Sequence, residues 1–132
     1  MPGFEASASC RAPAHEVWKL LHDPTRFPEW WAGLERVEAR GDGVTRYMEA
    51  WPDFPYPTRI SGRREQGRVT ISCLLSDVHH AWTLSPAPDG CRIQVRIEVP
   101  EAEAERLDAV REEVRTSLPR LIAVAERAAR GS

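Results

Sequence analysis

Four residues in the middle of the chain could carry out acid–base chemistry: Tyr47, Glu49, Arg64 and His80. A carboxylate buried among apolar groups has a raised pKa, and a nearby arginine lowers that pKa again. A histidine beside such a carboxylate could transfer protons near neutral pH. A few polar groups of this kind in an apolar pocket are typical of a small-molecule site. Two alternatives stay open, because Glu49 and Arg64 could form a simple ion pair and His80 could be a half-buried structural histidine.

Other catalytic chemistry has less support in the sequence. Cys73 has apolar neighbours that should keep its thiol protonated, and Ser61 and Ser72 lack the context of a nucleophile elbow. The segment "SGRREQG" has neither the spacing of a phosphate-binding loop nor a following helix. The adjacent His79 and His80 point to opposite faces of a strand and cannot easily chelate one ion. We therefore expect no cofactor and no metal.

Composition indicates an ordinary globular protein. The 132 residues predict a single domain spanning 1–132, and the net charge of −2 offers no basic excess for nucleic acid. Three cysteines without CxxC spacing are expected to be free thiols in a reducing cytoplasm. Neither a membrane-spanning run nor a leader peptide is recognisable, so we expect a cytoplasmic protein without integral membrane association. We expect a monomer or weak dimer, since edge strands can pair.

The spacing of the hydrophobic residues along the chain predicts which strands and helices position these side chains. The segment "FEASASCR" alternates as a strand, and "APAHEVWKLLH" has the spacing of a helix that ends at Asp23-Pro24. The stretch "PTRFPEWW" is then a short second helix or turn ending at Gly33. About six antiparallel strands follow, with turns at "GDG", Gln66-Gly67 and "PAPDG". Beyond Pro100, apolar residues recur at helical spacing and predict one long amphipathic helix.

The phase of two strands decides which side chains face the core. Around residues 46–51 either Tyr47, Glu49 and Trp51 or Arg46, Met48 and Ala50 point inward, and we favour the set with two aromatic rings. In "RVTISCLLS" we expect the odd-numbered positions 69–75 to face inward, which leaves Leu74 outside without an explanation. The segment "WPDFPYP" has too many prolines for a central strand and should be an exposed connection or an edge. Its aromatic rings could form a lid, a partner-binding patch, or packing against the short helices.

This order of elements, and above all the segment "APAHEVWKLLHDPTRFPEWW", resembles the START-like superfamily, also called SRPBCC or helix-grip. The resemblance implies an α+β fold, in which a strongly curved antiparallel sheet of about seven strands wraps around the C-terminal helix. Two short helices lie between strands 1 and 2. Members include lipid and sterol carriers, polyketide aromatases and cyclases, quinone-binding proteins and co-chaperones of the Hsp90 activator type. The fold alone does not select among these functions.

The resemblance also implies a cavity between the sheet and the long helix. We predict that it binds a small hydrophobic ligand such as a lipid, polyketide or quinone. One alternative is a polyketide cyclase/dehydrase-type enzyme with Glu49, His80 or Tyr47 as catalytic candidates, and another is a co-chaperone-like or toxin-like interaction module. We expect one indole of the Trp-Trp pair to be buried and the other to lie nearer solvent. The predicted lining is Trp30, Trp31, Tyr47, Glu49, Trp51, Arg64, Ile71, Cys73, His80, Trp82, Ile93, Val95, Val114, Leu118 and Leu121.

Overall fold

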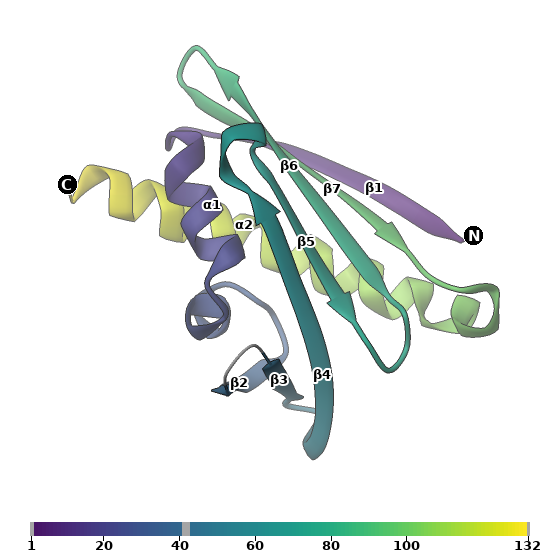
Figure 1. Cartoon of the computed structure of the whole chain (residues 1–132). Helices are drawn as coiled ribbons and strands as arrows, with labels where there is room; N and C mark the ends of the chain where they lie inside the picture. Colours follow the sequence, from purple (N-terminus) through teal and green to yellow (C-terminus); the bar gives the residue numbers. More distant parts are fainter. Residues whose placement is uncertain (1, 41–42, 132) are drawn as a thin grey trace.

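The computed structural model describes residues 2–40 and 43–131, which form one antiparallel sheet and a long C-terminal helix (Figure 1). The sheet order is β1-β7-β6-β5-β4-β3-β2, so β1 and β2 are its two edges. The predicted Gly41-Asp42 turn lies outside the described residues. The elements in chain order are β1 (Gly3–Cys10), α1 (Ala14–His22), η1 (Pro24–Glu29), β2 (Leu34–Arg40), β3 (Gly43–Met48), β4 (Trp51–Arg63), η2 (Arg64–Gln66), β5 (Arg68–Cys73), β6 (His79–Ala87), β7 (Gly90–Glu98), η3 (Glu101–Arg106) and α2 (Leu107–Arg130).

The predicted fold class is confirmed: seven strands, short helices between β1 and β2, and a C-terminal helix across the sheet. The strict alternation in β7 puts Cys91, Ile93, Val95 and Ile97 in the core. The apolar stripe of α2 covers the inner face of the sheet, and Leu121 and Ala125 are fully buried there.

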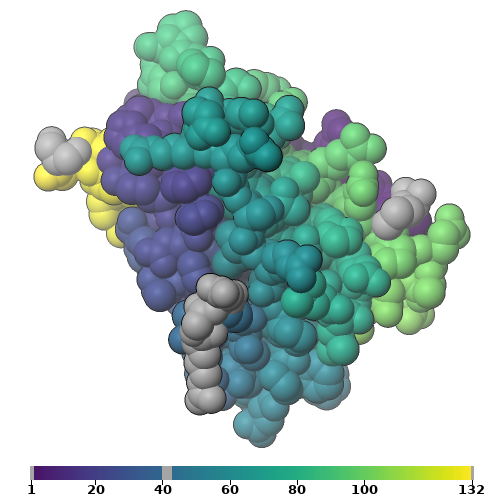
Figure 2. All heavy atoms as spheres, in the orientation of Figure 1, coloured from purple at the N-terminus to yellow at the C-terminus, as the bar shows by residue number. Residues whose placement is uncertain are grey.

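The first helix closes the other side of this core. Val17, Leu20 and Leu21 are fully buried, and the helix ends where Asp23 precedes a proline. The Trp18 indole donates to the Arg68 carbonyl at 3.3 Å, which fastens α1 to the β4–β5 hairpin. The space-filling view shows the atoms of α1 directly against this hairpin (Figure 2).

Two expectations about strands 4 and 5 are wrong. The segment "WPDFPYP" is the first half of the 13-residue strand β4, although its side chains are mostly exposed as predicted. Its prolines are tolerated because the neighbouring β3 pairs with it over only a few residues, interrupted by a register shift. Strand β5 ends at Cys73, so Leu75 does not continue the inward phase. It lies in the following turn and is 58% exposed.

Candidate functional site

A small pocket opens where β3, β4, β5 and β6 face the beginning of α2. Its volume is about 120 Å³. The walls combine apolar and polar side chains, including an arginine, a histidine, a cysteine and a glutamate. The lining residues are Arg46, Met48, Tyr56, Cys73, Ser76, Val78, His80, Arg106, Val110 and Glu113, and we call this hollow the inner pocket.

Arg46 is the principal cation of the inner pocket. The residue is 7% exposed, and its Nε donates to the Thr58 hydroxyl at 2.8 Å. The guanidinium carbon lies 4.5 Å from the centre of the Trp31 ring, a cation–π contact that partly replaces lost hydration. Within the described part of the chain, no carboxylate forms an ion pair with Arg46. Burial lowers the pKa of Arg46, while the nearby Glu113 and Cys73 oppose that change.

Glu113 supplies the carboxylate of the inner pocket from the facing surface of α2. Its Oε1 accepts a hydrogen bond from the indole nitrogen of Trp31. Burial raises the pKa of Glu113, and the Trp31 hydrogen bond and the charge of Arg46 only partly offset this effect. The protonated carboxylic acid is therefore easier to form here than on the protein surface.

His80 projects from β6 into the same pocket and is 7% exposed. Its ring centre lies 5.4 Å from that of Trp31. Burial, together with the charges of Arg46 and His79, lowers the pKa of His80 to about 3. The imidazole is thus neutral at neutral pH and can form hydrogen bonds without carrying charge. Burial first, and then the charge of Arg46, oppose the proton exchange near neutral pH that was expected of His80.

Cys73 also lines the inner pocket, in a more polar setting than its sequence neighbours indicate. Burial by itself raises the pKa of a thiol, but hydrogen bonds from Ser76 and Leu75 and the charge of Arg46 outweigh it. The net effect is a lowered pKa for Cys73. The surroundings of Cys73 are therefore more polar than the sequence indicates, because the chain turns after Cys73 and brings Ser76 back to the sulfur.

The favoured phase of β3 is wrong: Arg46 and Met48 line the inner pocket, whereas Tyr47 lies on the other face. Tyr47 instead contacts Arg36, whose guanidinium carbon is 3.7 Å from the ring centre, and its hydroxyl donates to Glu38 at 3.3 Å. We favoured this phase in order to bury two rings. Burial of Arg46 is possible because Trp31 and Thr58 partner its guanidinium.

Three predicted polar or aromatic contributors lie away from the inner pocket. Glu49 is exposed in the turn that separates β3 from β4. Trp51 begins β4 and is 66% exposed. Arg64 is exposed at the opposite end of β4, in η2. Glu49 and Arg64 therefore do not meet, because the whole length of β4 separates them.

The adjacent tryptophans Trp30 and Trp31 are both buried, at 2% and 3% exposure, so the predicted inequality is wrong. They follow η1 instead of continuing it, and different elements cover each ring. The Trp30 indole donates to the Leu20 carbonyl at 3.0 Å and packs edge-on against Trp82. Trp31 contacts Glu113 and Arg46 of the inner pocket, although neither tryptophan lines the pocket itself.

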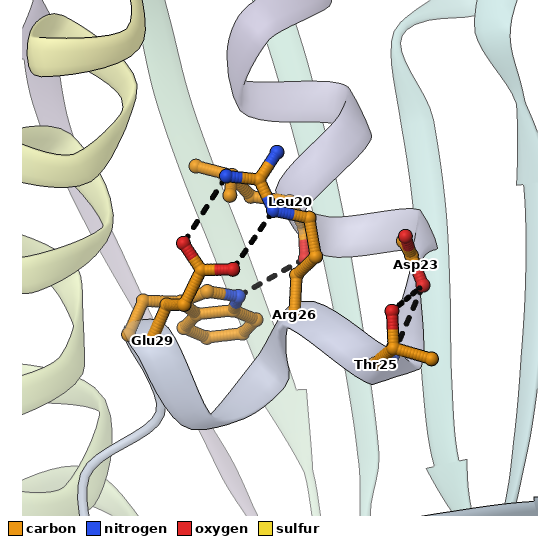
Figure 3. A network of polar contacts seen from close by, with 6 residues as sticks. Leu20, Asp23, Thr25, Arg26 and Glu29 are labelled. Atoms are coloured by element: carbon orange, nitrogen blue, oxygen red, sulfur yellow. Dashed lines mark hydrogen bonds and ion pairs between the residues drawn. The ribbon is translucent and has the colours of Figure 1, made fainter.

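The turn before these tryptophans is held by local polar contacts (Figure 3). The Asp23 carboxylate accepts from the backbone and hydroxyl of Thr25, and Arg26 pairs with Glu29 at 2.9 Å. This pairing raises the pKa of Arg26 and lowers that of Glu29. These contacts fix the backbone just before Trp30 and Trp31. The stretch "PTRFPEWW" thereby holds Trp31 against Glu113 and Arg46 of the inner pocket.

The predicted apolar lining divides between the core and a second hollow. Ile71, Trp82, Ile93, Val95 and Leu121 belong to the packed core and none of them lines the inner pocket. Val114 and Leu118 line an open groove of about 630 Å³ between β1 and α2, which we call the outer groove. Its walls are largely apolar and are formed by Phe4, Glu5, Ala6, Ala8, Arg111, Val114, Arg115, Leu118, Pro119, Ile122, Ala123 and Glu126.

Sequence reasoning missed the two charged residues that define the inner pocket. Glu113 interrupts the inward stripe of α2, three positions after Val110 and four before the buried Ser117. A charge at a helical core position is the signal that could have found it. Arg46 was considered, but only as a member of the less favoured phase of β3.

The fold and the pocket together define a class: a helix-grip protein with a small polar pocket between sheet and C-terminal helix. Residues 1–126 match the profile of the family described as "Polyketide cyclase / dehydrase and lipid transport", and the chain belongs to this family. Among curated proteins, none matches the chain. No helix within residues 2–40 and 43–131 is long and apolar enough to cross a membrane.

Solved structures share the fold at low sequence identity. A protein from Thermobifida fusca is 19% identical with a TM-score of 0.74, covering 96% of this chain and 95% of its own. A START superfamily protein from Mycobacterium smegmatis is 14% identical, with a TM-score of 0.68 and coverage of 98% and 97%. The di-domain ARO/CYC protein BexL, from the BE-7585A biosynthetic pathway, is 16% identical with a TM-score of 0.72, covering 96% of this chain and 46% of its own. At these identities the likeness concerns the fold.

Proposed function

We propose that the protein binds a small organic molecule through a carbonyl or anionic oxygen, which the inner pocket holds against Arg46. The observation that carries this proposal is a buried guanidinium that faces a pocket and has no ion-paired carboxylate among the described residues. A buried cation that forms no ion pair is costly even with Thr58 and Trp31 beside it and Glu113 nearby, and a ligand oxygen would give it a charge-assisted partner. A charge-assisted hydrogen bond would then orient the ligand.

The neighbours of Arg46 favour an oxygen-bearing group over a hydrocarbon. His80 is neutral and can donate one hydrogen bond, and Ser76 and Cys73 add further polar groups to the wall. Glu113 lies across the pocket with a raised pKa, so in its protonated form it can donate to the same oxygen. The pocket thus offers several donors that converge on one small volume.

The size of the pocket limits how much of the ligand is enclosed. At about 120 Å³ it is smaller than the roughly 300–1,000 Å³ typical of pockets that enclose a drug-sized ligand. It fits a head group, and the apolar remainder would leave through the mouth past Met48, Tyr56 and Val110. Phe54 lies 4.9 Å from Tyr56, ring centre to ring centre, and extends this apolar path outward. A hydrophobic ligand anchored by one polar end is therefore the class that we propose.

A second candidate function is acid–base catalysis of the cyclase or dehydratase type. The raised pKa of Glu113 beside Arg46 favours it, since a carboxyl group near a cation can accept a proton while the cation stabilises an enolate oxygen. Glu113 would take the role first assigned to Glu49. Tyr47 has no part in it, because it lies on the other face of β3. On any substrate found, Glu113→Gln should abolish turnover and retain binding.

The exposed rings of Trp51 and Phe54 favour a third candidate, a protein-interaction surface. They are 66% and 45% exposed on one strand. Capture of a partner that is lost in a Trp51→Ser/Phe54→Ser variant would support this candidate, and unchanged capture would exclude it.

The test of the binding proposal uses three probes of similar shape: benzoate, acetophenone and ethylbenzene. Dissociation constants are measured by NMR titration for the wild type, Arg46→Met and, as the matched control, Arg120→Met, which changes an exposed residue of α2 that lines neither hollow. We expect benzoate and acetophenone to bind and ethylbenzene to bind at least tenfold more weakly. Because Arg46→Met removes the charged donor, it should raise the dissociation constant of benzoate by about 100-fold. Equal binding of all three probes, or no effect of Arg46→Met, would contradict the proposal.

A further inference from the structure

The two edges of the sheet differ in how they are protected against pairing. Strand β2 carries Glu35, Arg36 and Glu38 along its edge, and such charges discourage another strand from adding to a sheet. Strand β1, with the sequence GFEASASC, has Glu5 as its single charged residue. Its other outward-facing positions are glycine or serine. The β1 edge therefore lacks the protection that the β2 edge has.

The hydrogen-bonding groups of this open edge can be assigned. Val99 N donates to the Pro2 carbonyl at 2.9 Å, so the even-numbered residues of β1 point their peptide groups toward β7. The peptide groups of Gly3, Glu5, Ser7 and Ser9 consequently point to the open edge. Arg11 N follows the same alternation and donates to the Glu126 carboxylate at 2.8 Å. A run of free donors and acceptors thus lies beside the outer groove.

The outer groove continues this edge as an apolar surface. Phe4, Ala6 and Ala8 point into it from β1, where they are half-buried, and face the side of α2 that carries Leu118 and Ile122. The volume of the outer groove is about 630 Å³. An open strand edge next to an apolar groove offers a partner both backbone hydrogen bonds and side-chain burial.

We propose that a second copy of this chain occupies the groove, with the two β1 strands pairing antiparallel about a two-fold axis at Ala6. This arrangement places each Phe4 opposite Ala8 of the other copy. The Phe4 ring of each copy thereby packs over the small Ala8 side chain of the other copy. The two outer grooves merge into one apolar core beneath a continuous sheet, and the interface is isologous, as in most dimers.

The charges at the ends of the groove fit the same two-fold axis. Arg111 lies at the Phe4 end, with its guanidinium carbon 5.3 Å from the ring centre. Glu126 lies at the other end, where it accepts from Arg11 N. Antiparallel pairing brings the basic end of one groove to the acidic end of the other. A two-fold axis at Glu5 instead would place two carboxylates opposite each other, which is unfavourable.

Two measurements test this arrangement. Sedimentation equilibrium of the wild-type protein should show a monomer–dimer equilibrium. Ala6→Cys should then form a disulfide-linked dimer under mild oxidation, since opposed residues that do not share hydrogen bonds lie about 4.5 Å apart at Cα, within disulfide range. Ala8→Cys is the matched control, because its predicted neighbour is Phe4 of the second copy, and it should not cross-link.

A proline variant separates pairing from folding. Ser7→Pro removes an amide that points to the open edge and leaves the β1–β7 hydrogen bonds intact, so the monomer should fold normally by circular dichroism. Two lost hydrogen bonds per dimer should weaken dimerisation by about 100-fold. If Ser7→Pro does not fold, Ala6→Glu serves instead, since it places two carboxylates on the axis. A wild-type protein that stays monomeric at millimolar concentration, or equal cross-linking of Ala6→Cys and Ala8→Cys, would overturn the proposal.

Discussion

The inner pocket and the outer groove lie on two sides of the same helix and have opposite properties. The pocket is small, about 120 Å³, and contains a buried arginine, a neutral histidine and a carboxyl group with a raised pKa. The groove is about 630 Å³ and largely apolar, with Glu5, Arg111, Arg115 and Glu126 as its charged lining residues. Glu113 faces the pocket and the next residue, Val114, faces the groove, as expected for side chains about 100° apart on a helix.

The comparison shows that the volume of a hollow does not determine the chemistry of the side chains that line it. The larger hollow provides burial without polar specificity, which suits a second protein surface better than a ligand that must be oriented. The smaller hollow is lined by the buried polar residues Arg46, Ser76 and His80. We therefore propose that the inner pocket recognises the ligand, and we expect substitutions in the pocket to have larger effects than substitutions in the groove.

The largest expected effect is a pH dependence of stability that comes from His80. Its pKa is about 3 in the folded protein and 6.5 ordinarily, so the folded state favours the neutral ring. A lowered folded pKa contributes stability above pH 6.5 that is lost as the pH falls toward 3. This difference corresponds to about 5 kcal/mol over the full range. Urea unfolding at several pH values should show the loss, and His80→Gln should flatten the curve.

Two further variants provide comparisons for this pH dependence of stability. The raised pKa of Glu113 acts in the opposite direction, because protonation at low pH favours the folded state. Glu113→Gln should therefore make the loss of stability at low pH steeper. Ile122→Val, in the outer groove, is the control and should leave the curve unchanged in shape, because it alters no titratable group. A His80→Gln curve that parallels the wild type between pH 6.5 and pH 4 would contradict the assigned environment of His80.

A smaller effect is expected from the indole nitrogens of two buried tryptophans. The Trp31 indole donates to Glu113, whereas the Trp82 indole nitrogen has no partner among the described residues. Trp31→Phe leaves a carboxyl group without its donor and should lower the free energy of unfolding by about 1–3 kcal/mol. Trp82→Phe removes an unsatisfied donor, so the expected change is under about 1 kcal/mol. Thermal unfolding of both variants measures these changes. Equal losses of unfolding free energy would contradict the proposed role of the Trp31 hydrogen bond.

The smallest effect is expected in the outer groove. Arg115 is largely exposed, with its guanidinium 3.5 Å from Glu112 one helical turn away. Surface ion pairs of this kind contribute little, so Arg115→Gln should change the free energy of monomer unfolding by less than about 0.5 kcal/mol. Chemical denaturation of the dilute protein measures this free energy of unfolding. A loss comparable to that of Trp31→Phe would show that the groove is as finely organised as the pocket.

The fold could be predicted from the sequence because its signals are local. The alternation in β7, the stop at Asp23-Pro24 and the long apolar stripe of α2 each specify one element. The resemblance carried by "APAHEVWKLLHDPTRFPEWW" then fixes how these elements combine. Local signals also have limits, since the same proline-rich segment that predicted a loop pairs as β4 once β3 lies beside it.

The site was harder to predict because it depends on contacts between distant segments. Whether Arg46 or Tyr47 faces inward is decided by Trp31 and Thr58, which lie 15 residues before and 12 residues after Arg46. Hydrophobicity alone favours burying the tyrosine. His80 and Cys73 were correctly placed on the inner face by strand alternation, but their pKa directions follow from Arg46 and Ser76. Strand alternation predicts a side chain's direction and leaves its electrostatic partners undetermined.

The most direct test of the account is where acetophenone binds. In the ¹⁵N-labelled protein, the Arg46 Nε–H and Trp31 indole signals report on the inner pocket, and the amides of Ala6 and Ala8 report on the outer groove. We expect added acetophenone to shift the Arg46 and Trp31 signals in a saturable manner and to leave the Ala6 and Ala8 signals unchanged. Saturable shifts confined to Ala6 and Ala8, with Arg46 and Trp31 unmoved, would contradict this expectation.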